Sequence, residues 1–261
     1  MQKAILLSLI FSFIFVGCTP KTQILWKDKY VCVEQKKLDK KEFLENFSLN
    51  INDRKLLSQA IDRITLENIL NQDTINISPF VDENKDYSEI AVIKVKISNK
   101  EKLKSINNII QQIPYSLIVF YIYENEISLC LSPKRINKAD SSKLVVEEVN
   151  FSKWIDFSNL TNIDKSFLQS LSINNHPFTN LLSFYESFMD KLISYNASIY
   201  SGTLTVSKDT KQILEDIQKI EAQITEVKNK IKKEPNFNEK VTMNMELKKL
   251  NDKLKNLKEN L

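Results

Sequence analysis

Few residues of this sequence have the side chains and the spacing that chemistry requires. His176 is the only histidine, so neither a Ser-His-Asp arrangement nor a metal site with several histidines can form. It precedes Pro177 in a segment typical of a loop that interrupts a helix, where a single histidine usually has a structural role or lies exposed. The sequence therefore predicts no catalytic residue and no metal ligand at His176.

Two carboxylate pairs, Glu124 with Glu126 and Glu147 with Glu148, are the other candidates for chemistry. Carboxylates can hold a divalent metal ion beside a lysine, as in nucleases of the carboxylate and lysine type. Such a site requires an aspartate with a following Glu-x-Lys on a neighbouring strand, and none of the expected strands contains a Glu-x-Lys motif. Because adjacent strand residues point to opposite faces, Glu147 and Glu148 are not expected to share a metal ion. A metal-dependent nuclease is the third of three functional hypotheses.

The composition argues against nucleotide recognition. With two glycines, Gly17 and Gly202, the chain has no glycine-rich phosphate loop and no dinucleotide-binding motif. The 37 basic and 33 acidic residues give a net charge of +4, which lacks the basic surplus of most nucleic-acid-binding proteins. We therefore expect no cofactor, and the charge does not indicate nucleic acid as a partner.

The most concentrated basic cluster attached to the expected β-hairpin consists of Lys134, Arg135 and Lys138. Tyr121, Tyr123 and Trp154 are expected near this cluster, and basic side chains among aromatic rings can bind nucleic acid. A solvated loop beside a packed core would have the same pattern. The three basic residues are candidate contacts for phosphate or for a protein partner.

The first 18 residues have the pattern of a bacterial lipoprotein export signal. Lys3 precedes an apolar run over residues 4–16, and Gly17 and Cys18 follow at once. This run is too short to cross a bilayer core of roughly 30 Å, but it fits the core of a signal peptide. The pattern predicts lipidation at Cys18 and a membrane-associated mature chain. The alternative is that the segment is a buried N-terminal element or a misassigned start, in a cytoplasmic protein.

The two remaining cysteines, Cys32 and Cys130, lie far apart without a metal-ligand spacing. Export would permit a disulfide between them. Alternatively they are two separate thiols, since Cys130 sits in an apolar run where a small hydrophobic side chain would serve.

The elements that must position these residues form an α+β domain over residues 26–200. Near alternation of apolar and polar residues predicts a strand at 89–97, and a helix follows over 100–113. Apolar runs at 116–123 and 127–131 predict a β-hairpin. The remaining expectations are a helix with Asn52 as N-cap that runs to Ile64, strands at 65–70 and 144–149, and helices over 164–195. Together these elements predict one mixed or antiparallel sheet covered by helices.

The C-terminal region, residues 207–261, has the most regular periodicity. Two series of apolar residues recur in alternating steps of four and three, which is the pattern of a coiled-coil seam. A short segment with Pro235 separates them, which favours an antiparallel helical hairpin; pairing between chains is the alternative. A narrow seam leaves room for a protein partner, a second copy or the main domain to add burial. The predicted seam residues are Ile213, Ile217, Ile220, Ile224, Val227, Ile231, Met243, Leu247, Leu250, Leu254 and Leu257.

Several short motifs taken together resemble a known prokaryotic family. These are Lys36 to Lys41, Ile113-Pro114-Tyr115 before the hairpin, Lys134-Arg135 after it, and the run from Met245 to Leu250. On these residues the chain resembles the uncharacterised DUF4391 family from about Trp26 to Leu261. The resemblance implies a cytoplasmic accessory role beside methyltransferases and helicases of DNA restriction-modification or phage-defence systems. Residues 1–25 depart from the family pattern.

Two functional hypotheses precede the nuclease. In the first, the chain is a non-catalytic interaction protein that binds a protein partner or itself through the coiled coil, anchored to a membrane if Cys18 is processed. In the second, it is the cytoplasmic accessory protein that the resemblance implies. The two conflict, because a lipid anchor at Cys18 would place the chain outside the cytoplasm.

Overall fold

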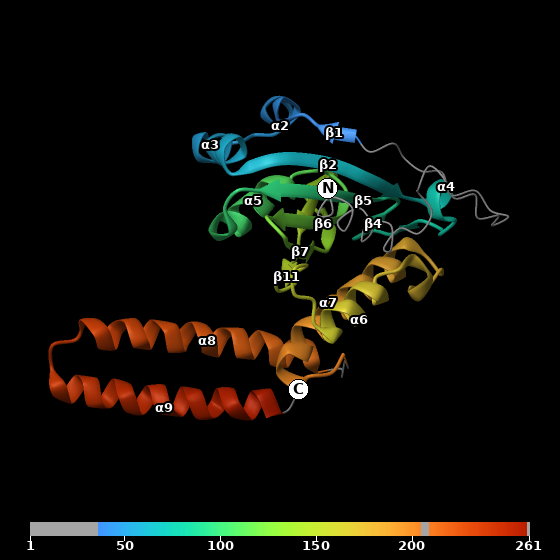
Figure 1. Cartoon of the computed structure of the whole chain (residues 1–261). Helices are drawn as coiled ribbons and strands as arrows, with labels where there is room; N and C mark the ends of the chain where they lie inside the picture. Colours follow the sequence, from blue (N-terminus) through green and yellow to red (C-terminus); the bar gives the residue numbers. More distant parts are fainter. Residues whose placement is uncertain (1–35, 205–208, 260–261) are drawn as a thin grey trace. The chain divides into compact units, whose positions relative to one another are not determined.

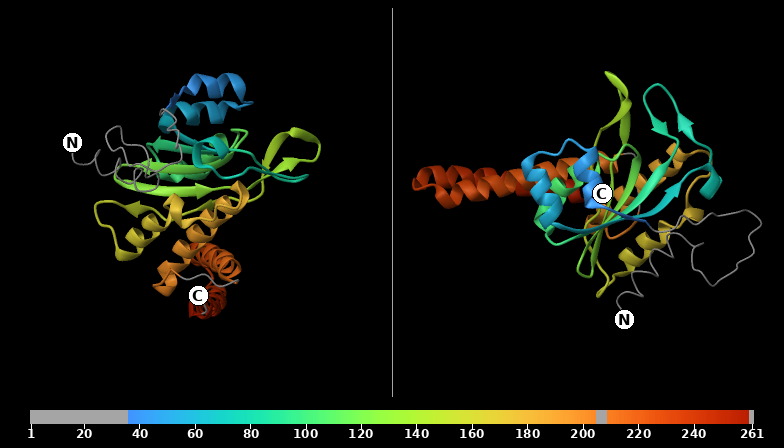
Figure 2. Two further views of the ribbon diagram at one scale, coloured as in Figure 1. Left: turned by 90° about the vertical axis from the view of Figure 1, so that its right-hand side faces the viewer. Right: turned by 90° about the horizontal axis from the view of Figure 1, so that it is seen from above.

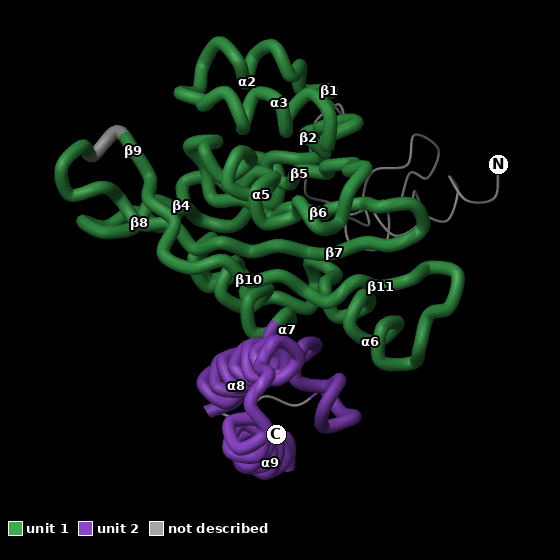
Figure 3. The backbone as a smooth tube through the Cα atoms, turned by 90° about the vertical axis from the view of Figure 1, so that its left-hand side faces the viewer, with its two compact units in different colours: residues 1–192 green, residues 193–261 purple. Residues whose placement is uncertain are grey.

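The computed structural model describes residues 36–204 and 209–259, and the chain divides into two compact units, residues 1–192 and 193–261 (Figures 1 and 3). The export signal with Cys18, and Cys32, lie outside the described residues. Within the described ranges, no helix combines the length and the apolar character needed to cross a membrane.

The first unit is built on a mixed sheet in the order β1-β2-β5-β6-β7-β10, with β11 also paired to β7. Strands β5 and β6 run parallel, whereas the other neighbouring strands are antiparallel. A parallel pair requires a crossover, and η1 (Lys100–Lys102) with α5 (Leu103–Ile110) provides it. The strands are β1 (Lys36–Leu38), β2 (Ile61–Leu70), β5 (Ile90–Ile97), β6 (Ser116–Tyr123), β7 (Glu126–Leu131), β10 (Asn150–Phe151) and β11 (Ile155–Asp156).

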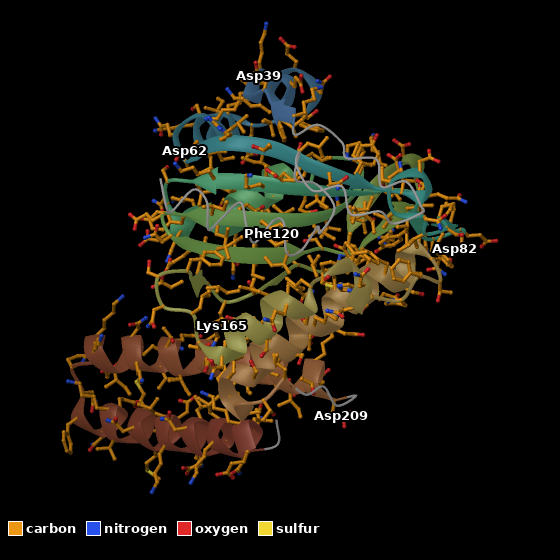
Figure 4. All side chains as sticks on the ribbon, turned by 45° about the vertical axis from the view of Figure 1, so that its right-hand side comes forward. Asp39, Asp62, Asp82, Phe120, Lys165 and Asp209 are labelled. Carbon is orange, nitrogen blue, oxygen red and sulfur yellow. The ribbon has the colours of Figure 1, made fainter. Side chains whose placement is uncertain are left out.

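Helices cover both faces of this sheet, which confirms the predicted fold class. Helices α2 (Lys40–Asn46) and α3 (Ile51–Gln59) lie on one side, and α6 (Asn162–Ser170) and the first part of α7 (Leu181–Ser201) on the other (Figure 2). Alternate residues of β5 and β6 face each helical layer. Val119 packs in the core with α3 and α5, whereas the next residue, Phe120, faces the opposite side from the middle of the sheet (Figure 4).

The helix predicted from Asn52 to Ile64 is wrong in its second half. Helix α3 ends at Gln59, and its N-cap is Asn50, whose Oδ1 accepts from the Asp53 N–H at 2.9 Å. Strand β2 begins at Ile61, and Ile64 lies opposite Val95 of β5. Burial of these isoleucines against the neighbouring strand outweighs their helical spacing, because tertiary packing routinely overrides local preference.

Two short ribbons extend from the sheet and meet each other (Figure 2). The first pairs β3 (Phe80–Val81) with β4 (Asp86–Tyr87), shortly after α4 (Gln72–Ile75). The second pairs β8 (Lys134–Asn137) with β9 (Asp140–Val146), and the Ile136 N–H donates to the Asn84 carbonyl at 2.7 Å. The strand predicted at 144–149 therefore begins earlier and belongs to a ribbon. Glu147 and Glu148 follow that strand rather than lying within it.

The predicted interruption between the last helices of the α+β domain is confirmed. Helix α6 ends at Ser170, the short η2 (Ile173–Asn175) follows, and α7 begins at Leu181. Cys130 is a buried free thiol on β7.

The second unit contains the antiparallel helical hairpin of α8 (Thr210–Lys233) and α9 (Phe237–Glu259) (Figure 1). It also contains the last residues of α7, where Ile193, Ala197 and Tyr200 pack with Leu214 of α8. The boundary between the two units therefore falls inside α7, earlier than the expected hairpin start at residue 207.

Candidate functional site

The seam of the helical hairpin is covered unequally on its two helices. On α8, the predicted residues Ile217, Ile220, Ile224 and Val227 are buried. In the first turn of α8, Leu214 is buried, whereas the sequence predicted Ile213 at this position of the seam. Ile213 and Ile231 are half-buried, as are all five predicted seam residues of α9, Met243, Leu247, Leu250, Leu254 and Leu257.

Helix α9 has no buried residue in its described length. Its seam faces α8, yet each seam side chain keeps contact with solvent. Near the open ends of the hairpin, Lys258 Nζ lies 3.1 Å from Glu221 Oε1 and 4.6 Å from the centre of the Tyr200 ring. These contacts support the antiparallel pairing of the helices. The seam itself has apolar surface left to cover.

A second apolar stripe lies on the outer side of α9, and we call it the outer stripe. Phe237, Val241 and Met245 are 76%, 44% and 61% exposed. They recur every fourth residue, so they line one side of the helix. Because each residue turns an α-helix by about 100°, Val241 and Met243 point about 200° apart. The outer stripe therefore faces away from α8.

The basic cluster expected at the surface is not formed, because Lys134 is only 1% exposed. Its Nζ donates to the carbonyls of Gln111 at 3.0 Å and Ile113 at 2.7 Å, at the C-terminal end of α5. Burial lowers the pKa of Lys134 to about 7. A helix end leaves carbonyls without intrahelical partners, and Lys134 donates to that of Gln111 at the end of α5. The Ile113 carbonyl also accepts from the Tyr115 N–H at 2.9 Å. Its ammonium is therefore not available to a phosphate at the surface.

The other two members of the basic cluster lie apart from Lys134. Arg135 is half-buried, with Nη1 3.3 Å from the Ile136 carbonyl, whereas Lys138 is exposed in the turn of the ribbon. Two of the aromatic rings expected beside the cluster contact another lysine, Lys100. Lys100 Nζ lies 5.2 Å from the Tyr123 ring centre and 4.8 Å from the Trp154 ring centre. Arg135 and Lys138 remain predicted contacts.

One charged pair was not predicted from the sequence. The carboxylate of Glu67 on β2 is buried in an ion pair with Lys94 of β5. Glu67 falls at the β-bulge between Leu66 and Asn68, which brings it near Lys94 across the two strands. Glu67 on β2 and Lys94 on β5 are opposite charges on strands that pair, and this was the signal that could have revealed the ion pair.

The charged pair satisfies only part of what a carboxylate and lysine nuclease requires. The residue two positions before Lys94 on the same strand face is Val92, so a second carboxylate is missing there. In the expected carboxylate pairs, Glu126 forms an ion pair with Lys100, and Glu124 occupies the β6–β7 turn with φ of 52°. Across the described residues, no group of three histidine, cysteine or acidic side chains could hold a metal ion.

His176 has a structural role in the connection between α6 and α7. Its ring stacks on Phe188 with centres 3.9 Å apart, and Nδ1 lies 3.1 Å from Ser187 Oγ. Burial, together with the charge of Lys191, lowers the pKa of His176 to about 3. The neutral ring therefore accepts at Nε2 from Lys191 Nζ, 3.2 Å away, which also donates to the carbonyl of Ser170. Its hydrogen bonds are made within the fold.

A family model described as a domain of unknown function (DUF4391) matches residues 31–254. The chain belongs to the DUF4391 family. No curated protein and no solved structure matches it. The match covers the mixed sheet and most of the helical hairpin, so both belong to the DUF4391 domain.

Two motifs on which the chain resembles the DUF4391 family contact each other in the structure. Ile113-Pro114-Tyr115 follows α5, and Lys134 of the second motif donates to the Ile113 carbonyl. This hydrogen bond links the segment between α5 and β6 to the ribbon strand β8. Ile113 and Lys134 of the DUF4391 motifs therefore stabilise the fold.

Proposed function

We propose that this DUF4391 protein is a non-catalytic interaction module that acts through its C-terminal hairpin. The observation that supports this most is the incomplete burial of α9, whose seam is half-exposed and whose outer stripe faces away from α8. Covering apolar surface contributes about 25 cal/mol per Å². A helix or groove that covered α9 would therefore be favoured, as in other helix-mediated recognition.

The polar groups of the first unit also support a non-catalytic role. Lys134, His176 and Lys191 use their polar atoms in hydrogen bonds that close helix ends and loops. Glu67 and Lys94 satisfy each other's charge. Catalytic side chains usually stand in a cleft with a pKa matched to a proton transfer, and these groups instead stabilise the fold.

Partner capture from the native host tests the proposed function. The full chain is compared with a seam variant, Leu247→Glu with Leu254→Glu, and with a control variant, Asn244→Glu with Asn251→Glu, which adds the same charges at exposed positions of α9. We expect a stoichiometric partner to co-purify with the wild type and the control but not with the seam variant. A partner retained equally by all three chains would contradict a role for the hairpin.

We also propose that the chain is anchored to a membrane through Cys18, on the evidence of the sequence pattern over residues 1–18. Expression from the native start in the native host, with a labelled fatty acid, should give a membrane-bound chain that lacks the residues before Cys18 and carries the label. The Cys18→Ser variant should carry no label and keep its full mass. A soluble, unlabelled and uncleaved wild type would instead favour the cytoplasmic accessory role in restriction-modification or phage defence.

A further inference from the structure

We propose that the side chain of Trp26 docks into an apolar cavity of the first unit, on the face of the sheet that carries α3 and α5. Trp26 lies ten positions before Lys36, the first residue that the structure describes. Docking of Trp26 concerns the first unit alone, so it does not depend on the role of the helical hairpin.

The cavity has a volume of about 150 Å³ and lies beyond the C-terminal end of α5, over β2 and β5. Four segments provide its apolar walls: Leu38 of β1, Ile69 of β2, Ala91 of β5 and Ile113 after α5. Leu38, Ile69 and Ile113 are half-buried, so they have apolar surface left to cover. An apolar cavity of roughly this size accepts a benzene ring. An aromatic side chain therefore fits it.

The cavity also contains an acceptor for the indole N–H. The carboxylate of Glu89, the residue before β5, lines the cavity. Its Oε1 accepts from Asn71 Nδ2 at 3.0 Å, and its Oε2 accepts no hydrogen bond from the described residues. Tryptophan is a large apolar ring with a single donor, which usually finds an acceptor when it is buried. Lys27, the residue after Trp26, adds a charge opposite to that of Glu89.

The path of the chain brings Trp26 within reach of the cavity. Strand β1 is antiparallel to β2, and its first residue, Lys36, lies opposite Leu66. Extending β1 backward from Lys36 therefore leads toward Ile69, which lines the cavity. Residues 27–35 can span at most about 30 Å. A ring at position 26 can therefore reach a cavity that begins beside β1.

Docking would shorten the link between the fold and a lipid on Cys18. Residues 19–25 would connect the lipid to the first unit, instead of residues 19–35. The shorter segment spans at most about 25 Å, so the first unit would stay close to the membrane surface. This consequence rests on the proposed anchor, whereas the docking itself does not.

Tryptophan fluorescence tests the docking, because the chain has two tryptophans. In the full chain with Cys18→Ser and Trp154→Phe, Trp26 is the single reporter. Its emission should lie at shorter wavelength than that of N-acetyltryptophanamide, and acrylamide should quench it several-fold less. Ala91→Leu fills the cavity, so it should shift the emission to the wavelength of the free amide and restore the quenching. Ala139→Leu, the same change at an exposed position of the ribbon, is the matched control and should alter neither.

Indole in solution provides a second measurement that leaves the cavity walls intact. Indole should raise the melting temperature of the Trp26→Ala chain, because its cavity is vacant, and Ala91→Leu added to this variant should abolish the rise. The chain with Trp26 should show no rise, because its own ring occupies the cavity. Tyr30→Ala removes the other aromatic ring of residues 19–35 and should behave like the chain with Trp26. Circular dichroism confirms that each variant is folded.

The docking is overturned if acrylamide quenches Trp26 like the free amide, or if a folded Ala91→Leu chain keeps the emission of the wild type. Equal stabilisation by indole with and without Trp26 would show that the cavity is open to a ligand or to a partner's side chain instead. A Trp26→Ala chain that indole does not stabilise would also contradict the docking. Partner capture through Leu247 and Leu254 is measured separately, so either proposal can fail alone.

Discussion

Replacing Lys134 with alanine should lower the free energy of unfolding at pH 7 by about 3 kcal/mol, because the change removes a buried aliphatic stem and leaves the Gln111 carbonyl without this donor. Nζ of Lys134 bonds to the carbonyls of Gln111 and Ile113, so the loss acts at the point where α5 leads into β6. Chemical denaturation of the wild type and the variant measures it. Lys138→Ala, at an exposed position of the same ribbon, is the control and should change stability by less than about 0.5 kcal/mol. An equal effect of the two changes would contradict the buried position of Lys134.

The same lysine makes the stability depend on pH. Because the folded chain holds the pKa of Lys134 at about 7, the unfolded chain binds this proton more tightly between pH 7 and its ordinary range. The folded state therefore gains stability as the pH rises through this window. Lys134→Met, which keeps the length without the charge, removes this gain. The stability difference between wild type and Lys134→Met should rise by about 1.5 kcal/mol from pH 7 to 8.5.

The difference between the two chains is needed because other buried groups, present in both, act in the opposite direction at higher pH. Burial raises the pKa of both Cys130 and Tyr87 to about 12. Each group ionises first in the unfolded chain as the pH rises, so stability is then lost. A flat difference between wild type and Lys134→Met over pH 7 to 8.5 would show that Lys134 stays charged in contact with solvent.

Removing the hydroxyl of Tyr185 on α7 should also lower the free energy of unfolding strongly. Tyr185 Oη accepts from the Ser132 N–H at 2.8 Å and donates to the Leu117 carbonyl at 3.0 Å. Tyr185→Phe leaves both backbone groups buried without this partner, which should cost about 3 kcal/mol of unfolding free energy. Thermal and denaturant unfolding measure it. Burial raises the pKa of Tyr185 well above its ordinary value, so the hydroxyl remains able to donate over the whole working pH range.

Tyr115→Phe is the matched control for this change. Tyr115 is 45% exposed, so water can replace any bond of its hydroxyl, and the expected cost is below about 0.5 kcal/mol. A comparable loss in both variants would show that the bridge from Tyr185 to the two strands does not stabilise the fold.

The elements that were predicted well are those whose apolar residues recur at a regular spacing along the chain. The strand at 89–97 alternates, and the α9 seam repeats in strict steps of four and three, so each half-buried position from Met243 to Leu257 was predicted. On α8, Ile213 and Leu214 are adjacent and both apolar, and packing with Ala197 of α7 favours Leu214. Local spacing alone cannot distinguish two such neighbours.

The polar contacts of the first unit were harder to predict than the hairpin, because strand pairing across the chain brings their residues together. Glu67 meets Lys94 only when β2 pairs with β5 and a bulge shifts the register. Lys134 looked like a surface charge, because the sequence does not show that two carbonyls at the end of α5 face it. Whether a lysine lies in solvent or in the core depends on such distant partners.

The arrangement of strands also has a consequence for the speed of folding. The sheet pairs β5 with β6 in parallel through a crossover and brings β10 back to β7, so many of its contacts join residues far apart in sequence. Contacts of this kind slow the search for the native state, whereas an antiparallel pair of neighbouring helices has short loops to close. The hairpin of α8 and α9 should therefore be formed while the sheet is still being assembled.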